Sequence, residues 1–369
     1  MFFNNMLFGS ASTQYADALY YDVSNYSDSK TSITASGAFA EGLTANGNTM
    51  GYVRGGSFNA DGTIWMAWHG PSGANHAAGT PTDNEHRLNR YNLSTPWDIS
   101  TRTFVSNSGP VAVYKRSSTP TLAGFHGCAF NQAGTQFATW SPDNADVEIF
   151  ELSTAWDPTT LNTTKIGTLG AYTIGSNSGN YGGVSTGVTS DGKTYLVGIR
   201  SYYTGQLNVI LKTHILNNDL FVTGVHGSAS VSYKGEASYS GGGSGELWDD
   251  LLQGGAAIWN ADGSKLIIMP QFWRYIERSG GGTGGASNTG WGVFSASTAY
   301  DPTTLSADFT RDSVTNYAEE DDTTLRYISQ TIQSTCQLQV IQHGEKIVQY
   351  SYPGTTIGVW DTGETRRLR

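Results

Sequence analysis

The sequence predicts an all-β fold built from repeated antiparallel sheets, and three observations lead to this expectation. Charged residues make up only 14% of the 369 residues, whereas glycine occurs 46 times and aromatic residues reach 12%. This composition is typical of β-structure that is rich in turns. In addition, a glycine-containing turn recurs along the chain, and a second turn rich in Ser, Thr and Asp alternates with it. Repetition at such intervals indicates a fold assembled from similar units.

The first repeated turn places a glycine four residues after an apolar residue and shortly before an apolar run. Its copies read FNADGTIW, FNQAGTQF, VTSDGKTY, WNADGSKL and VIQHGEKI, and they contain Gly62, Gly134, Gly192, Gly263 and Gly344. Glycine tolerates the positive φ of a tight turn, and Asp or Asn in front of it favours the same geometry. We therefore expect a hairpin at each copy, with strands on both sides.

The second repeated turn is clearest in YNLSTPWDIST, FELSTAWDPTT and FSASTAYDPTT, with weaker copies around Asp28, Asp219 and Asp361. Ser, Thr, Asp and Pro favour a chain reversal at the end of a strand. Because the two turns alternate with a common period, each unit should contain four strands, with one turn after the first strand and the other after the third. We interpret the aromatic residues of this motif, Trp97, Trp156 and Tyr300, as packing residues.

The second strand of a unit is nearly continuously apolar, as in residues 64–68, 195–199 and 266–269. Such strands are covered on both faces. Sheets stacked around an axis meet this condition, so we predict a single β-propeller of four-stranded antiparallel blades. Five blades are favoured by the five copies of the first turn, while six or seven stay open. A tandem of sandwiches is the other architecture, but it does not explain the shared turns. An N-terminal strand within residues 20–39 should complete the C-terminal blade and close the ring.

The paired turns resemble the repeat of β-propeller proteins of tailed bacteriophages and, more distantly, WD-type propellers. The resemblance covers about residues 20–364, although the copies near Asn217 and at the C-terminus depart from the ST-x-[WY]-D spacing. It implies a propeller fold and suggests a virion protein. The family pattern carries no catalytic residue that could be transferred to this chain.

The composition also limits the function classes. The net charge of −10 and the pI of about 5.1 argue against binding to nucleic acid or to anionic membranes. No uninterrupted apolar stretch is long enough for a membrane helix, and residues 1–12 lack the basic start of a signal peptide. We expect residues 1–16 to be an anchoring or docking segment and residues 17–369 to form the propeller. Cys128 and Cys336 should be free, buried thiols.

Propeller geometry puts the two kinds of short turn on one face and the remaining connections on the other. That second face should receive the long irregular stretches, of which residues 225–254 are the longest. Long loops on a rigid scaffold are common binding surfaces. Aromatic residues in or beside these loops are therefore our candidates for ligand binding, although each ring could instead fill a gap between blades. The candidates are Tyr202, Tyr203, Trp248, Trp273, Tyr275 and Trp291.

We predict no catalytic residue, no metal and no cofactor. One loop is expected to hold His69, His76 and His86 with Asp83 and Glu85, but this spacing matches no metal-binding motif. The acidic run 319–322 leaves a Ca²⁺ site open. The innermost strands contain no Asp or Glu, and their ionisable residues are Arg54, His126 and the two cysteines.

These observations favour a non-enzymatic phage virion protein, a decoration of a tail, fibre or vertex that is assembled in the host cytoplasm. Its loop-rich face would attach to a host-surface glycan or to another virion protein, and residues 1–16 would contact neighbouring virion proteins. We expect no nucleic-acid partner and no membrane insertion, and we leave homo-oligomerisation open. Two alternatives remain: a glycan-active enzyme similar to propeller glycoside hydrolases, with carboxylates supplied by loops, or a secreted bacterial binding module.

Overall fold

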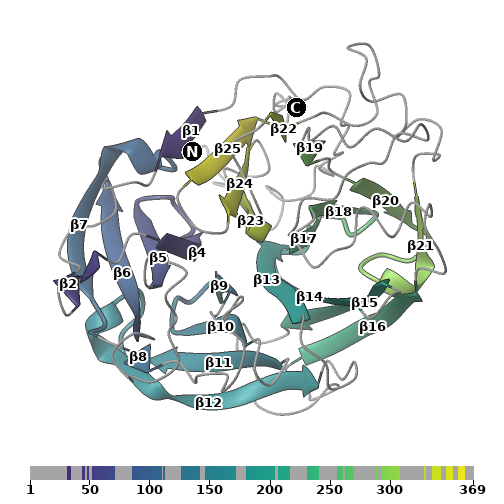
Figure 1. Cartoon of the computed structure of the whole chain (residues 1–369), viewed down its shortest axis with the longest axis horizontal. Coiled ribbons are helices and arrows are strands. Elements are labelled where there is room, and N and C mark those ends of the chain that lie inside the picture. Colours follow the sequence, from purple (N-terminus) through teal and green to yellow (C-terminus); the bar gives the residue numbers. More distant parts are fainter. Residues whose placement is uncertain are drawn as a thin grey trace, which may run out of the picture.

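The computed structural model describes residues 31–34, 44–45, 48–49, 52–70, 85–109, 111–112, 126–141, 146–171, 180–203, 207–216, 231–240, 256–260, 262–269, 288–289, 292–307, 328–329, 335–341, 346–351 and 356–361. These residues form an all-β structure with antiparallel four-stranded units around a common centre (Figure 1). The prediction of an all-β, propeller-like fold is confirmed. No helix in these ranges has the length and apolarity needed to cross a membrane.

Five four-stranded units can be followed within the described residues. Unit 1 consists of β4 (Tyr52–Phe58), β5 (Ile64–Gly70), β6 (Glu85–Leu93) and β7 (Arg102–Asn107). Unit 2 consists of β9 (His126–Phe130), β10 (Gln136–Ser141), β11 (Asp146–Leu152) and β12 (Leu161–Ala171). Unit 3 consists of β13 (Asn180–Val188), β14 (Thr194–Tyr203), β15 (Leu207–Leu216) and β16 (Val231–Ser240).

Unit 4 consists of β17 (Ala256–Trp259), β18 (Lys265–Met269), β20 (Gly292–Ala296) and β21 (Leu305–Ala307). Unit 5 consists of β23 (Thr335–Ile341), β24 (Lys346–Ser351), β25 (Thr356–Asp361) and β1 (Thr31–Thr34). The shorter strands are β2 (Thr44–Ala45), β3 (Asn48–Thr49), β8 (Val111–Ala112), β19 (Asn288–Thr289) and β22 (Ile328–Ser329). Short 3-10 helices are η4 (Ile99–Thr101), η5 (Pro158–Thr160) and η6 (Pro302–Thr304).

The first strand of each unit is the innermost one (Figure 1). Around the centre, β4 contacts β9, β9 contacts β13, β13 contacts β17, β17 contacts β23, and β23 contacts β4 again. Units 3 and 5 are also joined through one parallel pair, Thr186 with Gln339. The innermost strands therefore contact one another in a cycle.

The outer strand of unit 5 comes from the other end of the chain. β1 pairs antiparallel with β25, from Thr31 opposite Val359 to Thr34 opposite Thr356 (Figure 1). This pairing of an N-terminal strand with the C-terminal unit was expected and is confirmed. The proposed anchoring segment, residues 1–16, lies outside the described residues.

One expected loop contains a strand. Residues 231–240 were assigned to the long loop 225–254, but they form β16, which pairs with β15 along its length. The sequence VSYKGEASYS alternates apolar or small residues with polar ones, which is the pattern of a half-buried strand. Its position inside a glycine-rich stretch concealed this signal.

The two repeated turns contact each other. Gly62, Gly134 and Gly263 have φ of 71°, 70° and 72°, and an added Cβ would lie only 2.2–2.5 Å from the rings of Trp97, Trp156 and Tyr300 respectively. The backbone N–H of each aromatic residue donates to the carbonyl of its glycine at 2.9 Å. We call this contact the turn clasp. Glycine is required for two reasons: the positive φ disfavours any residue with a side chain, and the ring leaves no space for a Cβ.

The aromatic residues of the clasp are also in the left-handed region, with φ of 68°, 58° and 61°. This conformation is unfavourable for bulky residues, so the surrounding contacts must hold it. The aspartate that follows each ring contributes, because its carboxylate accepts from a backbone N–H in the 3-10 helix: Asp98 from Ser100 at 2.9 Å, Asp157 from Thr159 at 3.0 Å, and Asp301 from Thr303 at 2.9 Å. The Ser, Thr, Asp and Pro content of the motif is thereby explained.

Each clasp ring also packs towards the preceding unit. Trp156 stacks on Phe130 at 5.0 Å, and its carbonyl accepts from Arg90 of unit 1 at 3.3 Å. Tyr300 of unit 4 lies 5.7 Å from the ring of Tyr195 in unit 3. Trp97 packs on a buried cluster shared by units 1 and 5. The interpretation of these three residues as packing residues is confirmed.

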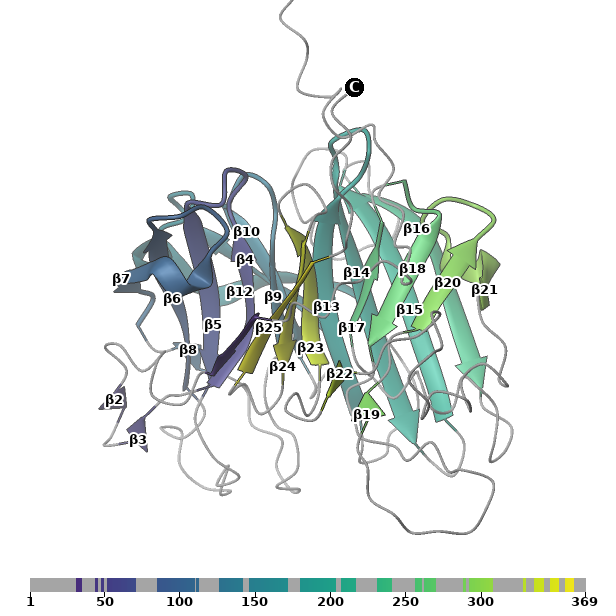
Figure 2. The same ribbon diagram turned by 90° about the horizontal axis from the view of Figure 1, so that it is seen from above.

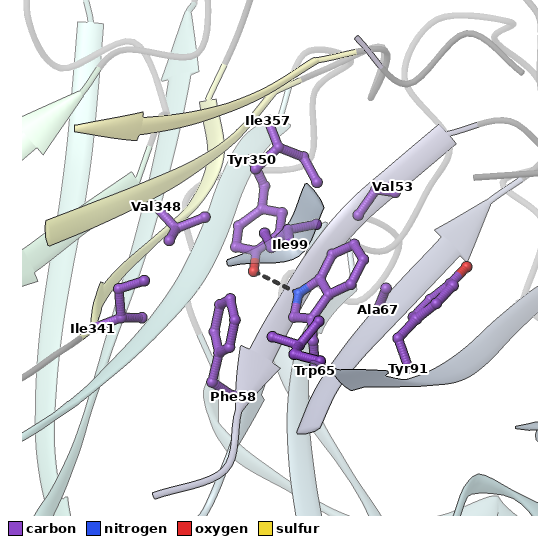
Figure 3. Close-up of a cluster of buried hydrophobic side chains, with 11 residues drawn as sticks. Val53, Phe58, Trp65, Ala67, Tyr91, Ile99, Ile341, Val348, Tyr350 and Ile357 are labelled. Atoms are coloured by element: carbon purple, nitrogen blue, oxygen red, sulfur yellow. Dashed lines mark hydrogen bonds between the residues drawn. The ribbon is translucent and has the colours of Figure 1, made fainter. Parts of the chain in front are cut away.

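The cluster between units 1 and 5 is drawn in Figure 3. Trp65 of β5 donates its Nε1–H to the Tyr350 hydroxyl of β24 at 3.0 Å, and the rings are fully buried. Phe58, Val348 and Ile357 pack around this pair. Burial raises the pKa of the Tyr350 hydroxyl, so it stays protonated and can serve as both donor and acceptor. Units at opposite ends of the sequence are thus joined by apolar contact and one indole–hydroxyl bond.

Gln337 of β23 links three innermost strands. Its side-chain oxygen accepts from the N–H groups of Gly56 and Cys128 at 2.9 and 2.8 Å, and its side-chain nitrogen donates to their carbonyls at 3.0 and 3.2 Å. Ser57 adds a bond from its hydroxyl to the Cys128 carbonyl at 2.8 Å. Protein atoms therefore fill the space between β4, β9 and β23. Cys128 is free and buried, as expected, and its burial raises the pKa of the thiol.

The turn clasp predicts different costs for two glycine-to-alanine changes. Gly192→Ala should lower the free energy of unfolding by about 1–2 kcal/mol, because φ is +81° but no atom of the described residues lies within 4 Å of the added Cβ. Gly134→Ala should cost about 1–3 kcal/mol more, since the Cβ also meets the Trp156 ring. Urea unfolding of both variants checks this; equal losses would contradict the clasp.

Gln337→Leu should lower the free energy of unfolding by about 3 kcal/mol or more, because it leaves buried backbone groups of Gly56 and Cys128 without their partner. The control is Thr103→Leu, an exposed change that should stay within about 0.5 kcal/mol. Equilibrium unfolding in urea measures both. If Gln337→Leu lowers the free energy of unfolding no more than the control does, the packing of β4, β9 and β23 does not depend on Gln337.

Candidate functional site

The two ends of the units differ. At the turn end, short turns connect the first strand to the second in units 1 to 4, with the clasps beside them. At the opposite end, where each first strand begins, lie all the short extra strands: β2 pairs with β3, β8 pairs with β6, and β19 pairs with β22. Figure 2 shows these strands along the lower edge of the molecule. We call this the loop-rich end, and it is the face on which ligand binding was predicted.

Two of the predicted ring residues can be placed. Tyr202 and Tyr203 end β14, where their backbones pair with Asn208 and Leu207 of β15. The antiparallel pairing of β14 with β15 places both residues at the loop-rich end. The other predicted ring residues lie outside the described residues: Trp248, Trp273, Tyr275 and Trp291.

Three buried basic side chains lie near the loop-rich end of unit 1. Arg54 lies near the start of β4, His69 near the end of β5, and His86 near the start of β6, and each is at most 1% exposed. Arg54 falls where the register between β4 and β5 shifts, between Val53 and Gly55. Such bulges redirect a side chain and are common beside functional sites. Arg54 was expected on an innermost strand, but no functional role was predicted for it.

The histidine loop was predicted incorrectly. His69 and His86 belong to strands β5 and β6, because the apolar pattern of each strand continues through these residues. His76 and Asp83 lie outside the described residues, as do residues 319–322. Within the described ranges, no group of three or more His, Cys, Asp and Glu side chains is placed to hold a metal ion.

His69 is part of a buried polar chain on the face of unit 1 that also carries Trp65 and Tyr91. Asn89 Nδ2 donates to the Tyr91 hydroxyl at 3.1 Å, and that hydroxyl lies 3.3 Å from His69 Nε2. Burial, with a smaller contribution from the Arg102 guanidinium, lowers the pKa of His69 to about 3. His69 is therefore neutral at pH 7. Asn89 donates to the Tyr91 oxygen, and the Tyr91 hydroxyl can in turn donate to Nε2 of the neutral imidazole.

His86 lies on the opposite face of the unit. Its ring stacks on Trp68 at 5.2 Å with an interplanar angle of 24°. The loop-rich end of unit 1 thus combines a permanent cation, a neutral imidazole and a stacked imidazole, whereas the observed innermost strands contain no Asp or Glu. Of these groups, the guanidinium can stabilise negative charge that develops on an oxygen atom.

The chain matches no protein-family model and no curated protein. Among solved structures it is similar to a proposed glycosidase from Bacteroides thetaiotaomicron, with 14% identity, a TM-score of 0.45, and coverage of 94% of this chain and 97% of that one. A periplasmic gluconolactonase from Pseudomonas aeruginosa matches with 11% identity, a TM-score of 0.38, and coverage of 85% and 83%. A β-propeller domain from Myceliophteria thermophila matches with 8% identity, a TM-score of 0.31, and coverage of 84% and 96%.

These similarities concern the fold and transfer no activity or residue role to this chain. They nevertheless correct two expectations. The non-enzymatic phage virion protein and the absence of enzymatic activity were inferred from turns, loops and a resemblance, whereas similar folds belong to proteins named as a glycosidase and a gluconolactonase. The glycan-active enzyme, given above as an alternative, agrees better with this finding.

The buried His69 makes stability depend on pH. In the unfolded chain it binds a proton near pH 6.5, but in the folded protein only near pH 3, so the unfolded state holds more protons between these values. The contribution of neutral His69 to the free energy of unfolding is therefore fully present above about pH 7 and declines as the pH falls. From pH 7 to pH 5, His69 should account for a loss of about 2 kcal/mol.

This loss is measured by urea unfolding at both pH values for the unmodified chain and for His69→Gln. The variant should lose less stability than the unmodified chain between pH 7 and pH 5, by about the same 2 kcal/mol. An identical decline in both proteins would show that His69 titrates normally in the folded state.

Proposed function

We propose that the chain is a closed, five-bladed β-propeller and that each four-stranded unit is one blade. The cyclic contacts of β4, β9, β13, β17 and β23 support this count. The pairing of β1 with β25 supports closure, because the last unit gains its fourth strand from the start of the chain. Closure of this kind leaves no unpaired unit at either end of the sequence.

We further propose that this propeller is an enzyme acting on a carbohydrate at the loop-rich end. The observation that carries the proposal is that three basic side chains, Arg54, His69 and His86, are buried near that end of unit 1. Buried ionisable groups are costly and are concentrated at functional sites. Because Gln337 and Ser57 join β4, β9 and β23 across the axis, the reaction would take place at the end of the propeller rather than deep inside it.

Opening of a sugar lactone fits these residues better than cleavage of a glycoside. Glycosidases usually need a pair of carboxylates, and the innermost strands supply none. Attack on a lactone carbonyl instead creates negative charge on its oxygen, which a fixed guanidinium such as that of Arg54 can stabilise. The proton of the attacking water passes to the ring oxygen as the ring opens. Water attacks the carbonyl carbon, the ring C–O bond breaks, and the product is the open hydroxy acid.

The predicted aromatic residues have a place in this proposal. Tyr and Trp rings stack on the apolar faces of sugars. Tyr202 and Tyr203 lie at the loop-rich end because they are the last residues of β14, where it pairs with the start of β15. We assign sugar contact to them and to the remaining candidates Trp248, Trp273, Tyr275 and Trp291.

The test is an assay of the purified chain with δ-gluconolactone and, in parallel, with nitrophenyl glycosides. We expect lactone opening above the spontaneous rate, and Arg54→Gln should lower kcat/KM by about 10²-fold through loss of an oxyanion partner. Lys193→Gln removes the same charge at the exposed turn end and should leave kcat/KM unchanged. Circular dichroism confirms that each variant is folded.

Two outcomes would contradict the proposal in different ways. Full lactone activity in a folded Arg54→Gln variant would exclude that residue from the site. Cleavage of the glycosides but not of the lactone would correct the reaction class, and no turnover of either substrate would overturn the assignment to carbohydrate chemistry.

A further inference from the structure

Two buried indole groups of this protein donate to a hydroxyl in the neighbouring unit. Trp65 of unit 1 donates to Tyr350 of unit 5 at 3.0 Å, and Trp259 of unit 4 donates to Thr213 of unit 3 at 2.9 Å. Trp68 is equally buried, at 1% exposure, but faces unit 2. Its Nε1 has no hydrogen-bond partner among the described residues. This donor is an exception that needs a physical explanation, since buried polar atoms are nearly always bonded to protein or water.

A second such atom lies on the facing surface of unit 2. Thr139 of β10 is fully buried, and its Oγ1 also has no hydrogen-bond partner among the described residues. Phe137 lies two residues before it and is 5.4 Å from the Trp68 ring. Because side chains alternate along a strand, Thr139 lies on the same face as Phe137, one step closer to the loop-rich end. Both atoms therefore belong to the interface of units 1 and 2, and they are not bonded to each other.

The surroundings of these two atoms are those of a small polar site. His86 stacks on Trp68 from the unit 1 side. Glu148 is paired directly opposite Thr139 on β11 and is the one carboxylate that the described part of the chain buries. Lys165 Nζ donates to Glu148 Oε1 at 2.7 Å. Towards the turn end, the stacked rings of Phe137 and Phe150 close the site with apolar surface.

We propose that a hydroxyl group binds here, between the Trp68 Nε1–H as donor and the Thr139 hydroxyl, with the Glu148 carboxylate as a further acceptor. A bridging oxygen would satisfy both buried atoms, which are not hydrogen-bonded to each other. The same chemistry is offered by a water molecule and by a hydroxyl of a sugar. The site shares His86 with the residues of the proposed function but uses neither Arg54 nor His69, and its test requires no turnover of substrate.

The test uses the full chain labelled with ¹⁵N and follows the Trp68 indole signal, which is assigned by its loss in Trp68→Phe. Two measurements are made: magnetisation transfer from water to the indole N–H, and the shift of that signal on titration with D-glucose. A water cross-peak with no glucose shift identifies water as the source. A saturable glucose shift that is absent in Thr139→Val identifies a sugar hydroxyl. The absence of both overturns the proposal.

The Trp259 indole is the matched control, because Thr213 already satisfies it. Its signal should show neither a water cross-peak nor a glucose shift. Urea unfolding gives a readout that does not depend on NMR. If the site is occupied, Thr139→Val loses hydrogen bonds and its urea midpoint falls, as it should for Thr213→Val, while Thr139→Ser keeps most of the stability. A raised midpoint for Thr139→Val would mean that the site is dry and would overturn the proposal.

Discussion

The architecture depends on the contact between a turn glycine and an aromatic ring held at positive φ. The glycine lies between the first two strands of a unit, whereas the ring lies between the last two, so the contact fixes all four strands relative to one another. In units 1 and 2 the ring packs on an apolar cluster shared with the preceding unit, and in unit 4 it packs on Tyr195 of the preceding unit, so the same contact helps to join neighbouring units. In unit 3 the glycine carbonyl is bonded differently: Gln132 of unit 2 donates to Gly192 at 3.3 Å. Unit 3 therefore also has a hydrogen bond to its preceding unit, although its copy of the aromatic turn motif is degenerate.

This contact explains why much of the fold was predictable. Both turns are local, and glycine, Asp, Ser and Thr are required by backbone geometry, so the repeat and its four-stranded unit are visible in the sequence. The N-terminal contribution to unit 5 could be inferred from a surplus copy of the second turn. β16 was missed because its period-2 pattern lies within glycine-rich sequence. The histidine loop was wrong at both ends, because β5 continues through His69 to Gly70 and β6 already begins at Glu85, before His86.

The candidate site was harder to predict because it is formed by residues that are distant in sequence. Arg54, His69 and His86 lie near the same end of unit 1 because three different strands begin or end there. Trp68 and Thr139 share an interface because units 1 and 2 pack against each other. No spacing rule connects such residues before the register is known. The expected function failed for a related reason: it rested on a resemblance of turns, and turns determine the scaffold rather than the chemistry that the scaffold carries.

The pairing of β1 with β25 has a consequence for biosynthesis. Thr31 is synthesised long before its partner Val359. The strands of units 1 to 4 all precede β25, so these units can form first, whereas unit 5 is completed only when β25 has emerged from the ribosome. Until then the pairing edge of β1 has no neighbour, and a polypeptide truncated before β25 would expose that strand edge to other molecules. The β1–β25 pairing therefore forms only in a polypeptide that contains all five units.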